Sequence, residues 1–236
     1  MKEFNNKITN LSNNSFLSYR FFQPVYIFLF VNLFLISGCS NINKNEDINI
    51  CSTTKLPCID SNEYVLFITN KGNIKLELYG KLAPITVGNF IDFIEKGSYN
   101  KTIFNRVIKK PYPFIIRGGD NTSIGNQNKS IDTKIKDKRY IPLEIKLKTS
   151  NLPIYGKEID EPSQINNIEL KHKRSYLSMA RSKALNSASL QFYILLKSLP
   201  ELDGRYAVFG KVISGMNIVD LIQEEDFIIE AKRVDS

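Results

Sequence analysis

Three blocks of sequence in a fixed order constrain the fold of this chain more than any other feature. They read FNRVIKKPYPFIIRGGD at 104–120, LSMARSKALNSASLQFYILL at 177–196 and LDGRYAVFGKV at 202–212. Each contains a short run of apolar residues, many of them aromatic or β-branched, which is typical of a buried strand. The Gly-Gly pair that follows the strand of the first block predicts a tight turn with positive φ, because glycine adopts that conformation without steric cost.

Strand patterns dominate the rest of the chain, with helical spacing at two separate places. Residues 64–69 and 73–79 predict a β-hairpin around Asn-Lys-Gly. A helix is expected from Pro84 to Gly97 and a shorter one near 216–222, because apolar residues recur there at helical spacing. The other expected strands are 104–108, 114–117, 141–145, 177–179, 192–195, 208–212 and 228–234. Many strands with two helices predict a mainly β fold, a closed barrel capped by helices.

The first 38 residues are organised like a targeting segment, and we exclude them from the fold as a signal peptide. Basic residues precede an apolar run over 21–36, which ends in Ser37, Gly38 and Cys39. Small residues before a cysteine resemble a bacterial lipobox, so we expect cleavage there and a lipid on Cys39. An uncleaved N-terminal anchor helix is the alternative. Both readings place the chain in the cell envelope, attached to the membrane with its body outside the cytoplasm.

Residues 39–62 are rich in Asn, Ser, Thr and charged residues with little apolar periodicity, which predicts a flexible, lipid-anchored linker. Cys51 and Cys58 lie within it. Outside the cytoplasm they could form a small disulfide loop or remain thiols, and the sequence leaves both open. No second pair of Cys or His residues accompanies them, so no metal site is expected.

The remaining residues, 63–236, suit one domain with a sizeable core, which we expect to be a monomer without a cofactor. The net charge of the chain is +8, but its lysines are scattered, so no nucleic-acid partner is expected. The single histidine, His172, lies in a basic stretch, where we expect a solvated loop residue. Two long polar loops, 121–139 and 148–173, are either functional or disordered.

The order and chemistry of the three blocks resemble the cyclophilin-type peptidyl-prolyl cis-trans isomerases over roughly residues 64–234. That resemblance implies an eight-stranded antiparallel barrel with a helix over each end. It also implies catalysis of Xaa-Pro bond rotation, here in exported or membrane-associated proteins whose folding the enzyme would assist. The alternative is a catalytically weak module on the same fold that binds proline-containing polypeptides as a chaperone or assembly factor.

The resemblance assigns roles to particular residues. Arg106 matches the catalytic arginine of the family's Phe-His-Arg motif, written here Phe-Asn-Arg. A guanidinium near the prolyl nitrogen stabilises the lone pair that appears when conjugation breaks, and it stays charged at any physiological pH. The implied substrate-binding residues line the proline pocket or face the peptide: Phe114, Ile115, Arg117, Ala180, Arg181, Gln191, Tyr193, Leu202 and Tyr206.

Several positions depart from the family pattern. Arg117 replaces a Gln that normally lines the site, and Asn105 replaces the His of the motif. Glu201 stands where many members carry Trp, and Tyr206 stands where many carry His. These departures bear on catalytic strength and peptide preference rather than on the fold.

Overall fold

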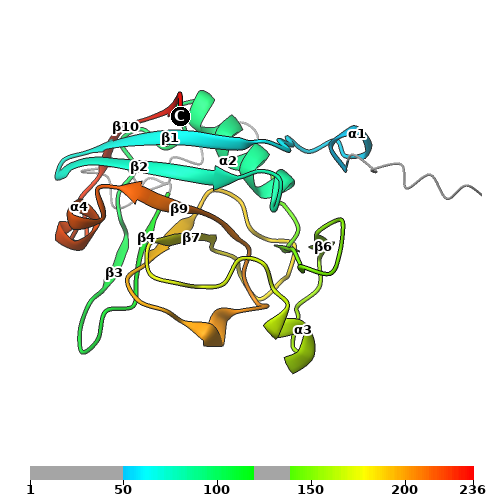
Figure 1. The fold of residues 1–236 in the computed structure, drawn as a ribbon. Helices are drawn as coiled ribbons and strands as arrows, with labels where there is room; N and C mark the ends of the chain where they lie inside the picture. Colours follow the sequence, from blue (N-terminus) through cyan, green and yellow to red (C-terminus); the bar gives the residue numbers. More distant parts are fainter. Residues whose placement is uncertain (1–49, 120–138) are drawn as a thin grey trace, which may run out of the picture. The chain divides into compact units, whose positions relative to one another are not determined.

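The computed structural model describes residues 50–119 and 139–236, and Figure 1 shows their arrangement. The expected signal peptide and Cys39 lie outside the described residues, as does nearly all of the loop 121–139. Within the described ranges, no helix combines the length and the apolar character needed to cross a bilayer.

Eight antiparallel strands form the main sheet, in the order β10-β1-β2-β9-β7-β8-β4-β3. Their bounds are Asn62–Thr69 (β1), Gly72–Tyr79 (β2), Arg106–Ile108 (β3), Ile115–Gly118 (β4), Tyr176–Met179 (β7), Phe192–Leu195 (β8), Val208–Ser214 (β9) and Ile228–Val234 (β10). The sheet curls until the segment before β3 meets the segment before β10. Ile103 bridges Phe227 there, and the Phe104 N–H donates to the Asp226 carbonyl at 2.7 Å. The expected barrel is therefore confirmed.

Alternate side chains of the strands fill the barrel, and two helices pack against it. Along β1 and β2, alternate residues such as Phe67 and Leu76 are fully buried, while their neighbours face outward. Helix α2 (Pro84–Glu95) contacts β2 and β10, and the shorter α4 (Met216–Leu221) contacts β2. In Figure 1 α4 lies at the left end of the β1–β2 pair and α2 towards its right half. Phe90 of α2 packs edge-on against Phe192 of β8, with ring centroids 5.6 Å apart.

The strand expected at 141–145 is mostly absent. Only Glu144–Ile145 (β5) is extended in a ladder, and it pairs with Ile154–Tyr155 (β6) outside the barrel. Glu144 lies in β5 itself, and its buried carboxylate caps the start of α2. It accepts the Ile85 N–H at 3.2 Å, the Thr86 N–H at 2.8 Å and the Thr86 hydroxyl at 2.6 Å. The residue that precedes α2, Ala83, makes no side-chain hydrogen bond to this end of the helix. Glu144 therefore accepts from backbone N–H groups that have no partner within the helix.

The long loop 148–173 is ordered. It contains β6 and the short helix α3 (Pro162–Asn166), and it buries a second apolar cluster beside the barrel. The buried members of that cluster are Leu143, Ile145, Leu147, Ile159, Ile168 and Ala207. The loop is thus a packed addition to the domain rather than a solvated connection.

The end of the expected linker is also fixed in place. Cys51 of the short helix α1 (Ile50–Thr53) forms a disulfide with Cys58, and their Cα atoms are 5.2 Å apart. The Ile59 N–H donates to the Pro84 carbonyl at 3.0 Å. Gly88 of α2 lies so close that a Cβ there would stand 2.4 Å from the Cys58 nitrogen. This part of the linker therefore packs on α2.

We expect Glu144→Ala to lower the free energy of unfolding by about 2–3 kcal/mol, because it leaves buried N–H donors of α2 without an acceptor. Urea denaturation followed by far-UV circular dichroism measures this loss. Glu169→Ala, at an exposed position, is the matched control and should change stability little. Equal losses in the two variants would contradict the capping role.

Candidate active site

Strand β8 separates the barrel core from a third apolar cluster, on the outer side of the sheet, which we call the outer cluster. Phe192 and Ile194 belong to the core, whereas Tyr193 and Leu195 belong to the outer cluster. The outer face is buried as well, because all four residues of β8 are buried. Six of the substrate-binding residues expected from the sequence meet in this outer cluster: Phe114, Ile115, Ala180, Tyr193, Leu202 and Tyr206. The structure thus brings residues of three separate sequence blocks into one apolar cluster.

Two guanidinium groups lie in line with this cluster. In the strand register Arg106 of β3 stands opposite Arg117 of β4, and Arg117 stands opposite Tyr193 of β8. Residues directly opposite in antiparallel strands share a face, with Cβ atoms about 4.5–5.5 Å apart. The Arg117 Nε donates to the Asn105 Oδ1 at 3.2 Å, which directs Arg117 towards its own hairpin. Arg117 and Asn105, the two residues of this hairpin that depart from the family pattern, are therefore hydrogen-bonded to each other.

Arg106 differs from Arg117 in having no such partner. It is exposed, and its guanidinium makes no hydrogen bond or ion pair with any residue that the structure describes. All of its donors are consequently free to bind a peptide in the pocket. The other predicted polar contact, Gln191, is half-buried just before β8, where its carbonyl accepts the Ala180 N–H at 2.9 Å.

His172 is buried beside Tyr193 of the outer cluster, so the expectation of a solvated loop histidine is wrong. Only 2% of its surface is exposed. Asp203 accepts both the His172 N–H and the ring Nδ1, each at 2.8 Å. The ring Nε2 lies 3.3 Å from the Tyr193 hydroxyl and 3.3 Å from the Ser178 Oγ. One sequence signal for this arrangement was available. Asp203 directly follows Leu202, which was already expected at the site.

Hydrogen bonds on both sides hold the His172 ring. An ionised Asp203 only accepts, so Nδ1 of His172 carries a proton. On the other side of the ring, Nε2 is hydrogen-bonded to the Tyr193 hydroxyl at 3.3 Å, and the nearby Ser178 hydroxyl donates to the Ala207 carbonyl at 2.9 Å. The chain Asp203–His172–Tyr193 therefore fixes the position of the Tyr193 ring.

Burial and hydrogen bonding act in opposite directions on Asp203. Burial alone would raise the pKa of Asp203, but the hydrogen bonds from the His172 ring and backbone outweigh it and lower the pKa below its ordinary value. Burial dominates for Tyr193 and raises the pKa of its hydroxyl, which therefore stays protonated as a donor. The site thus keeps an ionised Asp203 on one side of His172 and a protonated Tyr193 on the other.

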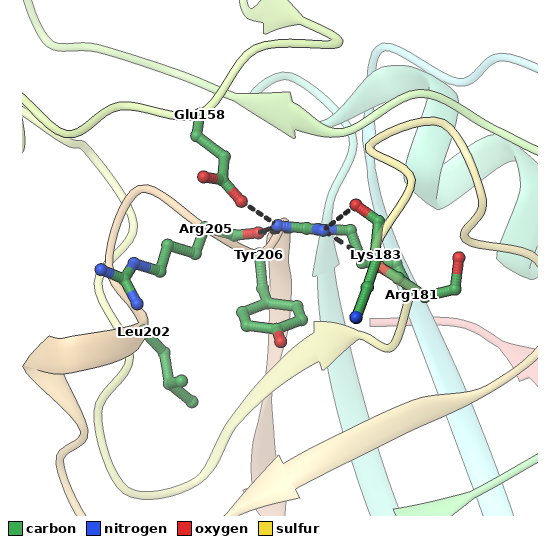
Figure 2. A pocket seen from close by; sticks show the side chains of 7 residues that line it. Glu158, Arg181, Lys183, Leu202, Arg205 and Tyr206 are labelled. Carbon is green, nitrogen blue, oxygen red and sulfur yellow. Dashed lines mark hydrogen bonds and ion pairs between the residues drawn. The ribbon is translucent and has the colours of Figure 1, made fainter.

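Arg181 was expected to face the peptide, but its side chain is only 7% exposed. Figure 2 shows the guanidinium between Glu158 and the backbone of the neighbouring loops. It pairs with the Glu158 carboxylate and donates to the Arg205 carbonyl through Nε at 2.9 Å. It also lies over the Tyr206 ring, 4.9 Å from the centroid. Arg181 is thus a clamp between loops, and its partner Glu158 was missed because it comes from the long polar loop.

Comparison with known proteins gives consistent matches. Residues 64–234 match the family model described as cyclophilin type peptidyl-prolyl cis-trans isomerase/CLD. Peptidyl-prolyl cis-trans isomerase-like 2 of Rhizopus delemar is 38% identical over 167 residues, which cover 70% of this chain and 26% of that protein. Peptidyl-prolyl cis-trans isomerase A of Dickeya dadantii is 34% identical over 169 residues, which cover 70% of this chain and 73% of that protein.

Solved structures agree with these matches. A cyclophilin type peptidyl-prolyl cis-trans isomerase of Cryptosporidium parvum, crystallised in the presence of the dipeptide Ala-Pro, has a TM-score of 0.53 and 31% sequence identity. The alignment covers 74% of this chain and 100% of that chain. The similarity therefore extends over the whole barrel.

The lowered pKa of Asp203 predicts a stability contribution that depends on pH. A carboxyl whose pKa falls on folding stabilises the fold above its unfolded pKa, near 4, and this contribution is lost as the pH falls through the folded value. Asp203→Asn should therefore cost about 1–3 kcal/mol at neutral pH, and the gap should narrow below about pH 4. Urea denaturation across this range measures it, with the exposed Asp235→Asn as control. A gap that does not vary with pH would contradict the argument.

Proposed function

The chain belongs to the cyclophilin-type peptidyl-prolyl cis-trans isomerases, and we propose that it performs this activity with Arg106 as the catalytic cation, on exported or membrane-associated clients. As a member of that family it is a peptidyl-prolyl cis-trans isomerase. Beyond the family's activity, we propose which residues bind the proline, which polypeptides are the clients and how the chain is anchored.

Rotation about an Xaa-Pro bond breaks no covalent bond. Amide resonance raises a barrier of about 18–20 kcal/mol, and a catalyst lowers it by binding the twisted amide better than either planar form. The apolar cluster around Tyr193 holds the proline ring by burial while the preceding acyl group turns. Arg106 then donates to the prolyl nitrogen, whose lone pair becomes an acceptor only when conjugation is lost. This interaction exists in the transition state alone, so it accelerates the reaction.

One observation carries the assignment of Arg106. It is an exposed cation without a partner in the described part of the chain, and it lies in register with Tyr193 on the face that holds the apolar cluster. Arg117, which is nearer to Tyr193 in that row, already donates to Asn105. The Cryptosporidium parvum relative studied with Ala-Pro supports a proline-containing peptide as the ligand.

Arg106→Ala should lower kcat/KM by about 100-fold without unfolding the domain, because it removes a transition-state donor from an exposed position. Arg106→Lys should recover little, since an ammonium does not reproduce the guanidinium fork. A protease-coupled assay with an Ala-Pro peptide measures both, and circular dichroism verifies the fold. Lys81→Ala, which removes another exposed cation, in the loop after β2, is the matched control. An unchanged rate in Arg106→Ala would leave a proline-peptide-binding chaperone as the better description.

A location outside the cytoplasm is the second part of the proposal. The small residues before Cys39 favour a lipid anchor. The Cys51–Cys58 disulfide supports the same location, because disulfides persist in oxidising compartments and are rare in the cytosol. A tethered monomer there meets polypeptides as they leave the membrane, which is where slow proline isomerisation limits folding.

The anchor has a direct test. Mass spectrometry of the full chain, expressed in a bacterium and extracted from membranes, should find Cys39 as the N-terminal residue with a covalent lipid. Cys39→Ser should abolish the lipid and leave the uncleaved chain. An intact Met1 terminus, or a soluble form with unmodified Cys39, would overturn the lipoprotein assignment while leaving the isomerase assignment untouched.

A further inference from the structure

A second hollow adjoins the proline pocket. It has a volume of about 520 Å³, and its lining residues are Glu158, Arg181, Ser182, Lys183, Leu202, Arg205 and Tyr206. Leu202 and Tyr206 also pack against the apolar cluster of the proline pocket. The rings of Tyr206 and Tyr193 meet edge to face with centroids 6.0 Å apart. The two sites therefore share a wall.

The charges around this hollow do not balance. Three cations line it against one acid, Glu158, and that acid is already paired with Arg181. Arg181 directs further donors to the carbonyls of Ser182 and Arg205, at 3.0 Å and 2.8 Å. Its positive charge is thus compensated and its donors are occupied. It holds the two loops that carry the other cations.

Lys183 and Arg205 remain uncompensated. Both are exposed, and neither side chain makes a hydrogen bond or ion pair with the residues of 50–119 and 139–236. Figure 2 shows their charged ends on opposite sides of the Arg181–Glu158 pair, with Leu202 and Tyr206 below. A planar guanidinium and a mobile ammonium beside an apolar wall suit a carboxylate, which Arg binds with two parallel hydrogen bonds.

We propose that this hollow is a subsite for an acidic side chain of the client polypeptide, two or three residues from the proline. The inference rests on the proposed function, because the proline pocket sets where the peptide lies. An extended peptide advances about 3.3 Å per residue, so a residue two or three positions away reaches the adjoining hollow. Arg205 binds its carboxylate, Lys183 adds positive charge from the other side of the hollow, and Leu202 and Tyr206 cover its methylene groups.

The expected preference is moderate and sensitive to salt. Ion pairs at exposed sites are weak and are screened within about 10 Å at 0.1 M salt. We therefore expect a Glu peptide to be turned over about fivefold better than its Gln counterpart at low salt, with a ratio that approaches one at about 0.5 M salt.

Exchange NMR on two peptide series tests this, because it needs no coupling protease. Glu, Gln or Lys is placed two or three residues before the proline in one series and after it in the other. In the wild-type domain the Glu/Gln ratio of kcat/KM should exceed one in a single series. Lys183→Glu and Arg205→Glu should each bring that ratio to one or below. Lys232→Glu, an exposed lysine on β10, carries the same charge change and should retain the wild-type ratio.

Two outcomes would overturn the subsite. One is a ratio near one in the wild-type domain in both series, and the other is a ratio that Lys183→Glu and Arg205→Glu leave unchanged or that Lys232→Glu lowers equally. Failure of the proposed function looks different, because then no peptide is turned over, including Gln peptides. In that case calorimetric affinities for the Glu and Gln peptides replace the rates, and the same ratios decide for or against the subsite.

Discussion

Burial of both faces of strand β8 is the constraint on which the rest of the structure depends. Its inward side chains complete an aromatic core in which Phe192 meets Phe67 and Phe90, each with ring centroids 5.6 Å apart. Its outward side chains form the outer apolar cluster with residues of the first and third sequence blocks. A shift of one residue in the register of β8 would exchange its inward and outward side chains and place the Tyr193 hydroxyl in the core. The core therefore fixes the register, and the register fixes the pocket.

Two buried carboxylates connect the additional segments to this barrel. Glu144 joins the chain that precedes the long loop to the start of α2, and Asp203 joins the end of that loop to the segment that covers β8. Each acid accepts several hydrogen bonds, which offsets the cost of its burial. Glu158 adds a more exposed link from the same loop to Arg181. The loop that distinguishes this chain is thereby attached at both edges of the candidate site.

The sequence predicted the elements that depend on local residue patterns. The first hairpin, the helix from Pro84 and strand β8 follow from residue periodicity, and the confirmed barrel follows from the order of the three blocks. The blocks also held six residues that the structure brings into one apolar cluster. What failed depended on distant partners. Only residues 144–145 of the strand expected at 141–145 form a ladder, with β6 of the long loop, and His172 is buried where it meets Asp203. The disulfide stayed open because pairing of Cys51 and Cys58 is a matter of three-dimensional distance.

The edge-to-face contact of Tyr193 and Tyr206 also gives the protein an internal optical probe. The chain contains no tryptophan, so no indole absorbs or emits over the tyrosine signal. Tyr206 both packs against the outer apolar cluster and lines the adjoining hollow. A peptide that contacts this ring would change its surroundings, and near-ultraviolet dichroism reports such a change in an unlabelled protein.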